Sequence, residues 1–322
     1  MNVREDVLRE RIDPALTPQT LSRIVGAALG APVTVTSWRP LAGGCWNRVI
    51  SPLGDPRAEQ VVLKIGPAPA DTALEREHAV LRWFAEHTRL TVPEPLLLDS
   101  SGSVIPGTFF VMRRLPGRPL HSAMSFLGQE DLRRIIVRIA EEVAELHATT
   151  AEGFGGVELS AEDRVPWAEF WLPRFDAVVR DAGRSGLFPQ AFLERIGAVR
   201  PGLPPLLDIG RTSTLTHYDI WAGNVMVEGA QGGVKVSGYI DVPGFWADPV
   251  RELSFAQMFG IADRLFYQVY TASHRLSDGW EVRRDLYNLK MHLKHVMMYP
   301  GERFYREGAS RCLSTVEAAL TS

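Results

Sequence analysis

Apolar residues recur with two different periods in the first third of the chain, which predicts a mixture of helices and strands. Residues 17–30 open with Thr-Pro, carry apolar residues at helical spacing and end at glycine, so they predict a short amphipathic helix. Residues 33–41 alternate between apolar and polar positions, as a strand does, and residues 60–65 form an apolar strand interrupted only by Lys64. Residues 72–87 return to helical spacing.

The next part of the chain extends this sheet and then becomes helical. Residues 93–99 and 107–114 have the composition of two more strands. A Leu-Pro-Gly break at residues 115–117 separates them from a predicted helix at residues 129–149, and residues 251–320 have helical spacing almost throughout. The sequence therefore predicts a sheet-containing part followed by a larger helical part.

Two charged residues occupy apolar faces of neighbouring predicted elements. Lys64 interrupts its strand, and Glu77 lies among the apolar positions of the following helix. A buried charge is costly unless an opposite charge compensates it, so each residue is the natural partner of the other. A surface lysine with an unrelated, solvated glutamate is the alternative that the pattern leaves open.

A polar loop between two short apolar runs has the strongest chemical pattern in the chain. Between Leu215-Thr216 and Val225 it reads His217-Tyr-Asp219-Ile-Trp-Ala-Gly-Asn224, which has the spacing H-x-D-x-x-x-x-N of a kinase catalytic loop. The spacing places Asp219 to orient an attacking hydroxyl and Asn224 to hold Mg²⁺. His217 is expected to brace the loop backbone and not to act as a base.

A second strand, residues 234–240, is expected to return beside the first and to end at Asp241 near Asn224. An amide oxygen and a carboxylate that converge on one point are hard donors suited to Mg²⁺. Asn224 and Asp241 are therefore the predicted metal ligands.

The ordered set of motifs resembles the aminoglycoside phosphotransferase and choline kinase superfamily, which comprises small-molecule kinases with a protein-kinase-like fold. The resemblance spans roughly residues 38–275. It implies an α+β, two-lobed protein-kinase-like fold, with an N-terminal antiparallel sheet and helix at residues 1–114 that bind nucleotide. Residues 115–322 would form the larger, mostly helical lobe for catalysis and substrate binding.

The resemblance also implies roles for individual residues. Asp219 would be the catalytic residue, Lys64 held by Glu77 would bind the α- and β-phosphates, and residues 112–115 would bind adenine through their backbone. The glycine pair at residues 43–44 would let backbone N–H groups approach phosphate, although a plain hairpin turn is an equal alternative. The expected nucleotide-binding residues are Gly43, Gly44, Asn47, Lys64, Glu77, Met112, Arg113, Arg114 and Leu115.

Three residues are candidates for the substrate pocket. Tyr218 stands where these small-molecule kinases usually have glycine, so its ring would reshape the acceptor site. Trp221 lies in the segment Trp-Ala-Gly-Asn, which resembles the sequences of fructosamine kinases more than those of typical aminoglycoside enzymes. Asp248 is the third candidate, and its place before a predicted helix also indicates an N-cap.

Composition limits the kinds of partner that the protein is expected to bind. The chain has 322 residues and a formal net charge of −3, which gives no basic field for nucleic acid, and no apolar run is long enough for a membrane span. With 2 cysteines and no signal-peptide core, a cytoplasmic protein is expected, as a monomer or homodimer.

The predicted reaction moves the γ-phosphoryl group of ATP or GTP, with Mg²⁺, to a hydroxyl of a small molecule. Residues 261–311 carry 6 acidic and 9 basic residues, whereas a polycationic aminoglycoside would need an acidic platform. A nucleoside-type or glycosylated antibiotic is therefore the favoured acceptor, with inactivation of the antibiotic as the result. A metabolic sugar or fructosamine kinase is the alternative, and a non-catalytic nucleotide-binding pseudokinase is the alternative from another class.

Overall fold

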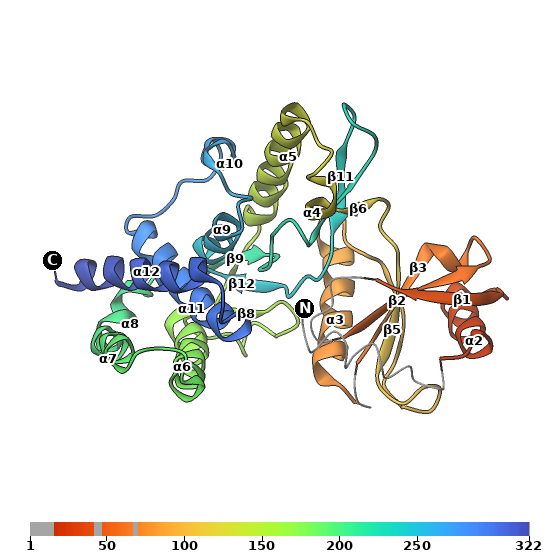
Figure 1. Cartoon of the computed structure of the whole chain (residues 1–322), viewed down its shortest axis with the longest axis horizontal. Helices are drawn as coiled ribbons and strands as arrows, with labels where there is room; N and C mark the ends of the chain where they lie inside the picture. The colour runs from red at the N-terminus through yellow and green to blue at the C-terminus, as the bar shows by residue number, and fades with distance from the viewer. Residues whose placement is uncertain (1–15, 42–46, 67–69, 322) are drawn as a thin grey trace. The chain divides into compact units, whose positions relative to one another are not determined.

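The computed structural model describes residues 16–41, 47–66 and 70–321 (Figure 1). Gly43 and Gly44 fall outside these ranges, so the predicted glycine-pair phosphate site lies outside the described residues.

The chain divides into two compact units. The first unit runs to Pro119 and also includes Met226–Glu228 and Ser237–Val242. The second unit consists of Leu120–Val225, Gly229–Val236 and Pro243–Ser322. The first unit therefore uses two later segments besides the N-terminal part, and the expected boundary between residues 114 and 115 stays a prediction.

An antiparallel sheet with the strand order β1-β2-β3-β5-β4 forms the first unit. Its strands are β1 (Val35–Pro40), β2 (Arg48–Gly54), β3 (Val61–Ile65), β4 (Pro95–Asp99) and β5 (Phe109–Arg113). Strands β1, β3, β4 and β5 fall within the segments for which the sequence predicts strands. Lys64 in β3 lies opposite Val49 of β2 and Phe110 of β5, so it occupies the middle of the sheet.

Among the described residues, two α-helices and one 3₁₀-helix accompany this sheet. Helix α2 (Pro18–Leu29) begins where the Thr17 hydroxyl accepts a hydrogen bond from the Thr20 N–H, and it ends at Gly30, whose φ of 64° is left-handed. Helix α3 (Thr72–His87) follows the Asp71 cap, and the 3₁₀-helix η1 (Ala58–Gln60) precedes β3.

The alternation of side chains along β3 separates a core face from a charged face. Val61, Leu63 and Ile65 join one hydrophobic cluster with residues of α2. Lys64 points to the other face, where it meets Glu77 of α3. The sheet thus carries α2 on one side and α3 on the other.

A small sheet has the order β11-β10-β6, with β6 (Arg118–Pro119), β10 (Val225–Glu228) and β11 (Lys235–Tyr239). This confirms that the strand before Asp241 returns beside the strand after the catalytic loop. Gly117 makes a close approach possible, because a Cβ there would lie 2.0 Å from the Val227 carbonyl oxygen and its φ is +86°.

Helices dominate the second unit. They are α4 (Leu120–Ala123), α5 (Gln129–His147), α6 (Trp167–Ser185), α7 (Gln190–Val199), η2 (Arg200–Gly202), α8 (Leu203–Leu206), α9 (Pro249–Met258), α10 (Arg264–Tyr270), α11 (Trp280–Met298) and α12 (Arg303–Thr321). A four-stranded sheet, ordered β7-β9-β12-β8, lies among them, with β7 (Thr150–Glu152), β8 (Gly155–Gly156), β9 (Thr212–Thr216) and β12 (Phe245–Ala247). Figure 1 shows α11 and α12 beside each other, and their contact is extensive.

The core of the second unit is rich in aromatic side chains. Trp167, Trp171 and Phe175 of α6 are almost completely buried and pack with Tyr287 of α11. The Trp167 indole N–H donates to the Tyr287 hydroxyl at 2.7 Å, so the polar edge of the ring is satisfied. The aromatic stripe of this helix is therefore core. Within the described ranges, no helix is both long enough and apolar enough to cross a membrane.

Candidate active site

Lys64 forms the centre of a buried charge cluster in the first unit. Its Nζ donates to Glu77 Oε1 at 2.6 Å and to Asp241 Oδ1 at 2.8 Å. The lysine is 7% exposed. The predicted pairing of Lys64 with Glu77 is confirmed, and Asp241 is a second partner that the sequence pattern did not reveal.

Burial and the neighbouring opposite charges shift the pKa values of this cluster in opposite directions. Burial would lower the pKa of Lys64, but Asp241 and Glu77 together outweigh it, and the pKa is raised. The pKa of Glu77 is raised mainly by burial and further by Asp241, against the opposing effect of Lys64. Lys64 therefore stays cationic, as the predicted role in binding phosphate oxygens would require.

Strand β5 leads into the segment expected to bind adenine. The backbone N–H groups of Arg113 and Arg114 donate to the carbonyl oxygens of Glu94 and Gln60, each at 2.8 Å. These two donors are already used within the first unit. Nucleotide binding by residues 112–115, and by Asn47 before β2, stays a prediction that depends on other groups of these residues.

The catalytic loop of the second unit connects β9 to β10 and is held by its own side chains. Asn224 Nδ2 donates to the backbone oxygen of Asp219 at 2.9 Å and to its carboxylate Oδ2 at 2.8 Å. The Asp219 N–H donates to His217 Nδ1 at 3.2 Å, and His217 is fully buried. The expectation that His217 braces the loop is confirmed, and Asp219 is fixed from both sides.

Tyr218 occupies a backbone conformation that favours glycine. Its φ is 82°, in the left-handed region. The ring lies 4.5 Å from Phe245, centroid to centroid, and the Arg251 guanidinium lies 4.3 Å above it. These contacts offset backbone strain of about 1–3 kcal/mol. The ring therefore packs against the core of the second unit, and a role of Tyr218 in the acceptor pocket stays a prediction.

Trp221 is fixed by its neighbours in the same loop. Its ring stacks on His121 at 6.0 Å and contacts Phe259. A Cβ on Gly223 would lie 2.2 Å from the Trp221 ring, so only glycine fits at that position. The structure thus explains the Trp-x-Gly spacing, while contact of Trp221 with substrate stays a prediction.

Asp248 has a structural role in the second unit. One of its oxygens caps α9 by accepting from the Val250 N–H at 3.0 Å, which confirms the expected N-cap. The other oxygen accepts from Arg283 Nε at 2.9 Å and from the Tyr287 hydroxyl at 2.6 Å. The carboxylate is 2% exposed. Both oxygens are therefore engaged, and substrate contact by Asp248 stays a prediction.

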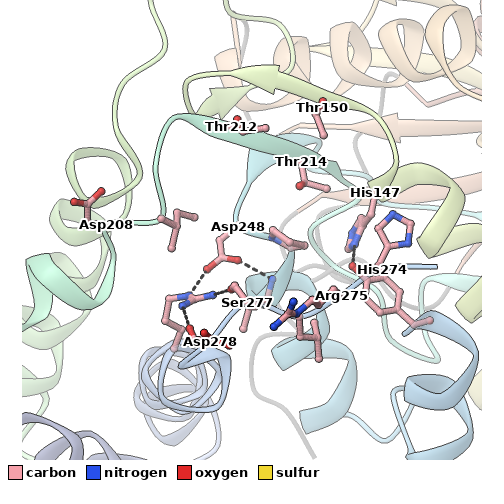
Figure 2. Close-up of a pocket in the computed structure, with 16 residues that line it drawn as sticks. His147, Thr150, Asp208, Thr212, Thr214, Asp248, His274, Arg275, Ser277 and Asp278 are labelled. Carbon is pink, nitrogen blue, oxygen red and sulfur yellow. Dashed lines mark hydrogen bonds and ion pairs between the residues drawn. The ribbon is translucent and has the colours of Figure 1, made fainter. Parts of the chain in front are cut away.

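Asp248 also lines a cavity of about 420 Å³, drawn in Figure 2. Threonines of β7 and β9 and residues 274–278 form other parts of its lining. Neither Asp219 nor Asn224 is among the lining residues. The cavity is therefore separate from the predicted catalytic loop residues.

We expect Arg283→Met to destabilise the protein by about 3–5 kcal/mol, because it leaves the buried Asp248 carboxylate without its cation. Thermal unfolding measures this effect as a lower Tm. The control is Arg303→Met, which removes an exposed ion pair with Glu307 and should change stability by less than about 1 kcal/mol. Equal Tm shifts for the two variants would contradict the structural role of Asp248.

His147 is buried at the end of α5. Its Nε2 lies 3.1 Å from Glu252 Oε2 and its Nδ1 lies 2.8 Å from the Tyr270 hydroxyl. These contacts join α5 to α9 and α10. His147 is therefore a structural residue.

The predicted metal ligands have the correct chemistry for Mg²⁺. The side chain of Asn224 donates two hydrogen bonds through Nδ2, so its carbonyl oxygen is oriented to bind a cation. Asp241 supplies a carboxylate. In the described part of the chain, no group of three or more His, Cys, Asp or Glu side chains could hold a metal ion. Asn224 belongs to the second unit and Asp241 to the first, so their convergence on one ion stays a prediction.

The paired Lys64 and Glu77, together with the braced catalytic loop, define a kinase-like phosphotransferase. The chain belongs to the phosphotransferase enzyme family, whose model matches residues 37–286. It is a small-molecule O-phosphotransferase with the two-lobed kinase-like fold.

Known proteins of this family include enzymes for different acceptors. A probable ketoamine kinase from Synechocystis is 24% identical over 313 residues, which cover 92% of this chain and 95% of that protein. A putative fructosamine-3-kinase structure from Haemophilus somnus superposes with a TM-score of 0.71 at 17% identity, covering 92% of this chain and 97% of that one. The GDP complex of aminoglycoside 2′-phosphotransferase IIIa superposes with a TM-score of 0.62 at 15% identity, covering 95% and 99%.

Proposed function

We propose that this protein is a ketoamine kinase, which transfers the γ-phosphoryl group of ATP or GTP to a sugar hydroxyl of a ketoamine. A ketoamine is the adduct of a sugar with an amine. The observation that carries the proposal is the similarity to a probable ketoamine kinase along nearly the whole of both chains. This similarity favours the metabolic alternative over the antibiotic acceptor that the charge pattern favours.

Lys64 would bind the α- and β-phosphates of the nucleotide. Glu77 and Asp241 hold its ammonium group in place from two sides at 2.6 and 2.8 Å. Asp241 and Asn224 would hold Mg²⁺, which would supply positive charge at the phosphates.

Asp219 would orient the acceptor hydroxyl and accept its proton late in the transfer. The Asn224 amide donates to the carboxylate at 2.8 Å and fixes its direction, and the bond from the Asp219 backbone N–H to His217 fixes the backbone of the loop. Phosphoryl transfer through a loose transition state depends on positioning and charge neutralisation and little on covalent chemistry by the protein. A rigid loop around Asp219 meets that requirement.

The test is a nucleotide-consumption assay with four acceptors: a fructose-derived ketoamine, free fructose, the free amine and kanamycin. We expect turnover of the ketoamine with ATP or GTP in the presence of Mg²⁺, and much slower turnover of the other three. The catalytically impaired Asp219→Asn variant serves as the control for contaminating kinases. Efficient turnover of kanamycin without turnover of the ketoamine would overturn the proposal and leave the phosphotransferase class intact.

A further inference from the structure

Three cationic side chains from three helices gather in the second unit. They are Arg174 of α6, Arg251 of α9 and Lys290 of α11, and we call them the cationic cluster. The pKa of Lys290 is lowered to about 7 by burial and then by the charges of Arg251, Lys294 and Arg174. The geometry agrees, because the rings under Arg174 and Arg251 both contact Phe245, at 5.5 and 4.5 Å between centroids, and the Lys290 Nζ lies 5.5 Å from the Trp171 centroid.

Aromatic rings surround the cationic cluster. The guanidinium carbons of Arg174 and Arg251 lie 3.7 and 4.3 Å from the ring centroids of Phe170 and Tyr218. Such contacts attract a cation to a ring face but leave its net charge in place. The cluster is thus a half-apolar site that carries uncompensated positive charge.

Carboxylates are missing where these cations would need them. In the parts of the chain that the structure describes, no member of the cationic cluster forms an ion pair with a carboxylate. Arg251 is 5% exposed, yet its Nη2 contacts the Met291 sulfur at 3.7 Å, its buried Nη1 has no hydrogen-bond partner, and its polar neighbour is the uncharged Tyr218 hydroxyl. Among the described residues, the buried Lys64 and Arg283 each contact a carboxylate. A buried guanidinium without an anionic partner is costly, and an anion would relieve that cost.

Tyr218 connects the cationic cluster to the catalytic loop. Burial raises the pKa of the Tyr218 hydroxyl, while the charges of Arg251 and Arg174 oppose this rise, so both arginines face the phenol. Tyr218 directly precedes Asp219. An anion bound by the cluster would therefore lie beside the predicted acceptor site, inside one compact unit.

We propose that the cationic cluster binds an anionic group of the acceptor, a carboxylate or a phosphate, and so selects acidic ketoamines over neutral ones. This inference rests on the proposed function. The planar guanidinium of Arg251 suits two-point hydrogen bonding to either anion, while the Lys290 ammonium supplies a further positive charge.

Three matched acceptors test the selectivity: the fructose ketoamines of glycine, glycinamide and aminomethylphosphonate. They present a carboxylate, a neutral amide and a phosphonate at the same position. We expect kcat/KM for one or both acids to exceed that of the amide by roughly ten- to a hundredfold, the scale of one charge-assisted hydrogen bond. The acid with the higher kcat/KM shows whether the cationic cluster prefers a carboxylate or a phosphate-like group. Equal kcat/KM for all three would overturn the proposal.

Variants locate the effect in the cationic cluster. Lys290→Met and Arg174→Gln, which change partly exposed residues, should reduce the acid-to-amide ratio of kcat/KM about tenfold or more. Arg251→Met should do the same if it folds, as judged by its Tm. Arg180→Gln, which changes an exposed arginine on the same helix as Arg174, is the matched control and should keep most of the ratio. If the cations only pack against rings, the ratio will not change in any variant.

A measurement without turnover separates this inference from the proposed function. The chain has four lysines, so NMR of ¹³C-labelled lysine can follow the titration of Lys290. Acetate or phosphate, compared with chloride at equal ionic strength, should raise the Lys290 pKa, because a bound anion favours the ammonium form. An unchanged titration would refute the anion site. A raised pKa together with no turnover of any ketoamine would refute the proposed function and retain the anion site.

Discussion

Replacing Asp219 by alanine is expected to lower kcat by about two to four orders of magnitude while nucleotide binding stays nearly intact. Asn224 holds the carboxylate of Asp219, and His217 accepts from its backbone N–H. Steady-state kinetics with the ketoamine acceptor measures kcat, and nucleotide titration measures binding.

The control for this experiment is Asp181→Ala, which removes an exposed carboxylate of the same unit. It should retain the parent kcat. If Asp219→Ala kept turnover within about tenfold of the parent at unchanged Tm, Asp219 would not be the base.

The second large effect concerns the Lys64 cluster. Lys64→Ala and Glu77→Ala should each weaken productive nucleotide binding, and the loss in the double variant should be smaller than the sum of the two losses. Residues in one buried ion-pair network couple by about 0.5–3 kcal/mol. Asp241 adds an asymmetry, because it still holds Lys64 when Glu77 is removed. Lys64→Ala should therefore be the more damaging single change.

A double-mutant cycle on kcat/KM for the nucleotide measures this coupling. Arg57→Ala and Asp55→Ala, an exposed pair of the same unit, give the matched control cycle and should show coupling below about 1 kcal/mol. Strict additivity for Lys64 and Glu77 would mean that they do not act as a unit.

Local sequence patterns were sufficient to predict much of the fold. The Thr17 cap and Gly30 predict the limits of α2, and the alternation of apolar residues predicts the strands of the first unit. The pairing of Lys64 with Glu77 was predictable because both charges stand on apolar faces of consecutive elements. These features depend on residues close in sequence, where period and spacing are informative.

Features built from distant residues could not be predicted in this way. Asp241 is 177 residues from Lys64, and nothing in its local sequence indicates a second role besides metal binding. The cationic cluster draws one residue from each of three helices, so each cation alone looks like an ordinary helix-surface residue. Of the three cations, Arg251 is the clearest candidate for a buried charge, because it lies within the run Val250–Ala256, which the structure buries.

The long separation between Lys64 and Asp241 has a consequence for how the protein is made. A ribosome adding roughly 5–20 residues per second needs about 10–35 seconds to synthesise the chain between them. For most of that interval Lys64 has Glu77 alone as its partner, and strand β6 lacks β10, its neighbour in the small sheet. The first unit can be completed only after residues 226–228 and 237–242 have been synthesised. Ribosome stalling between residues 119 and 226 would therefore leave β6 unpaired and the first unit incomplete, exposed to chaperones and proteases.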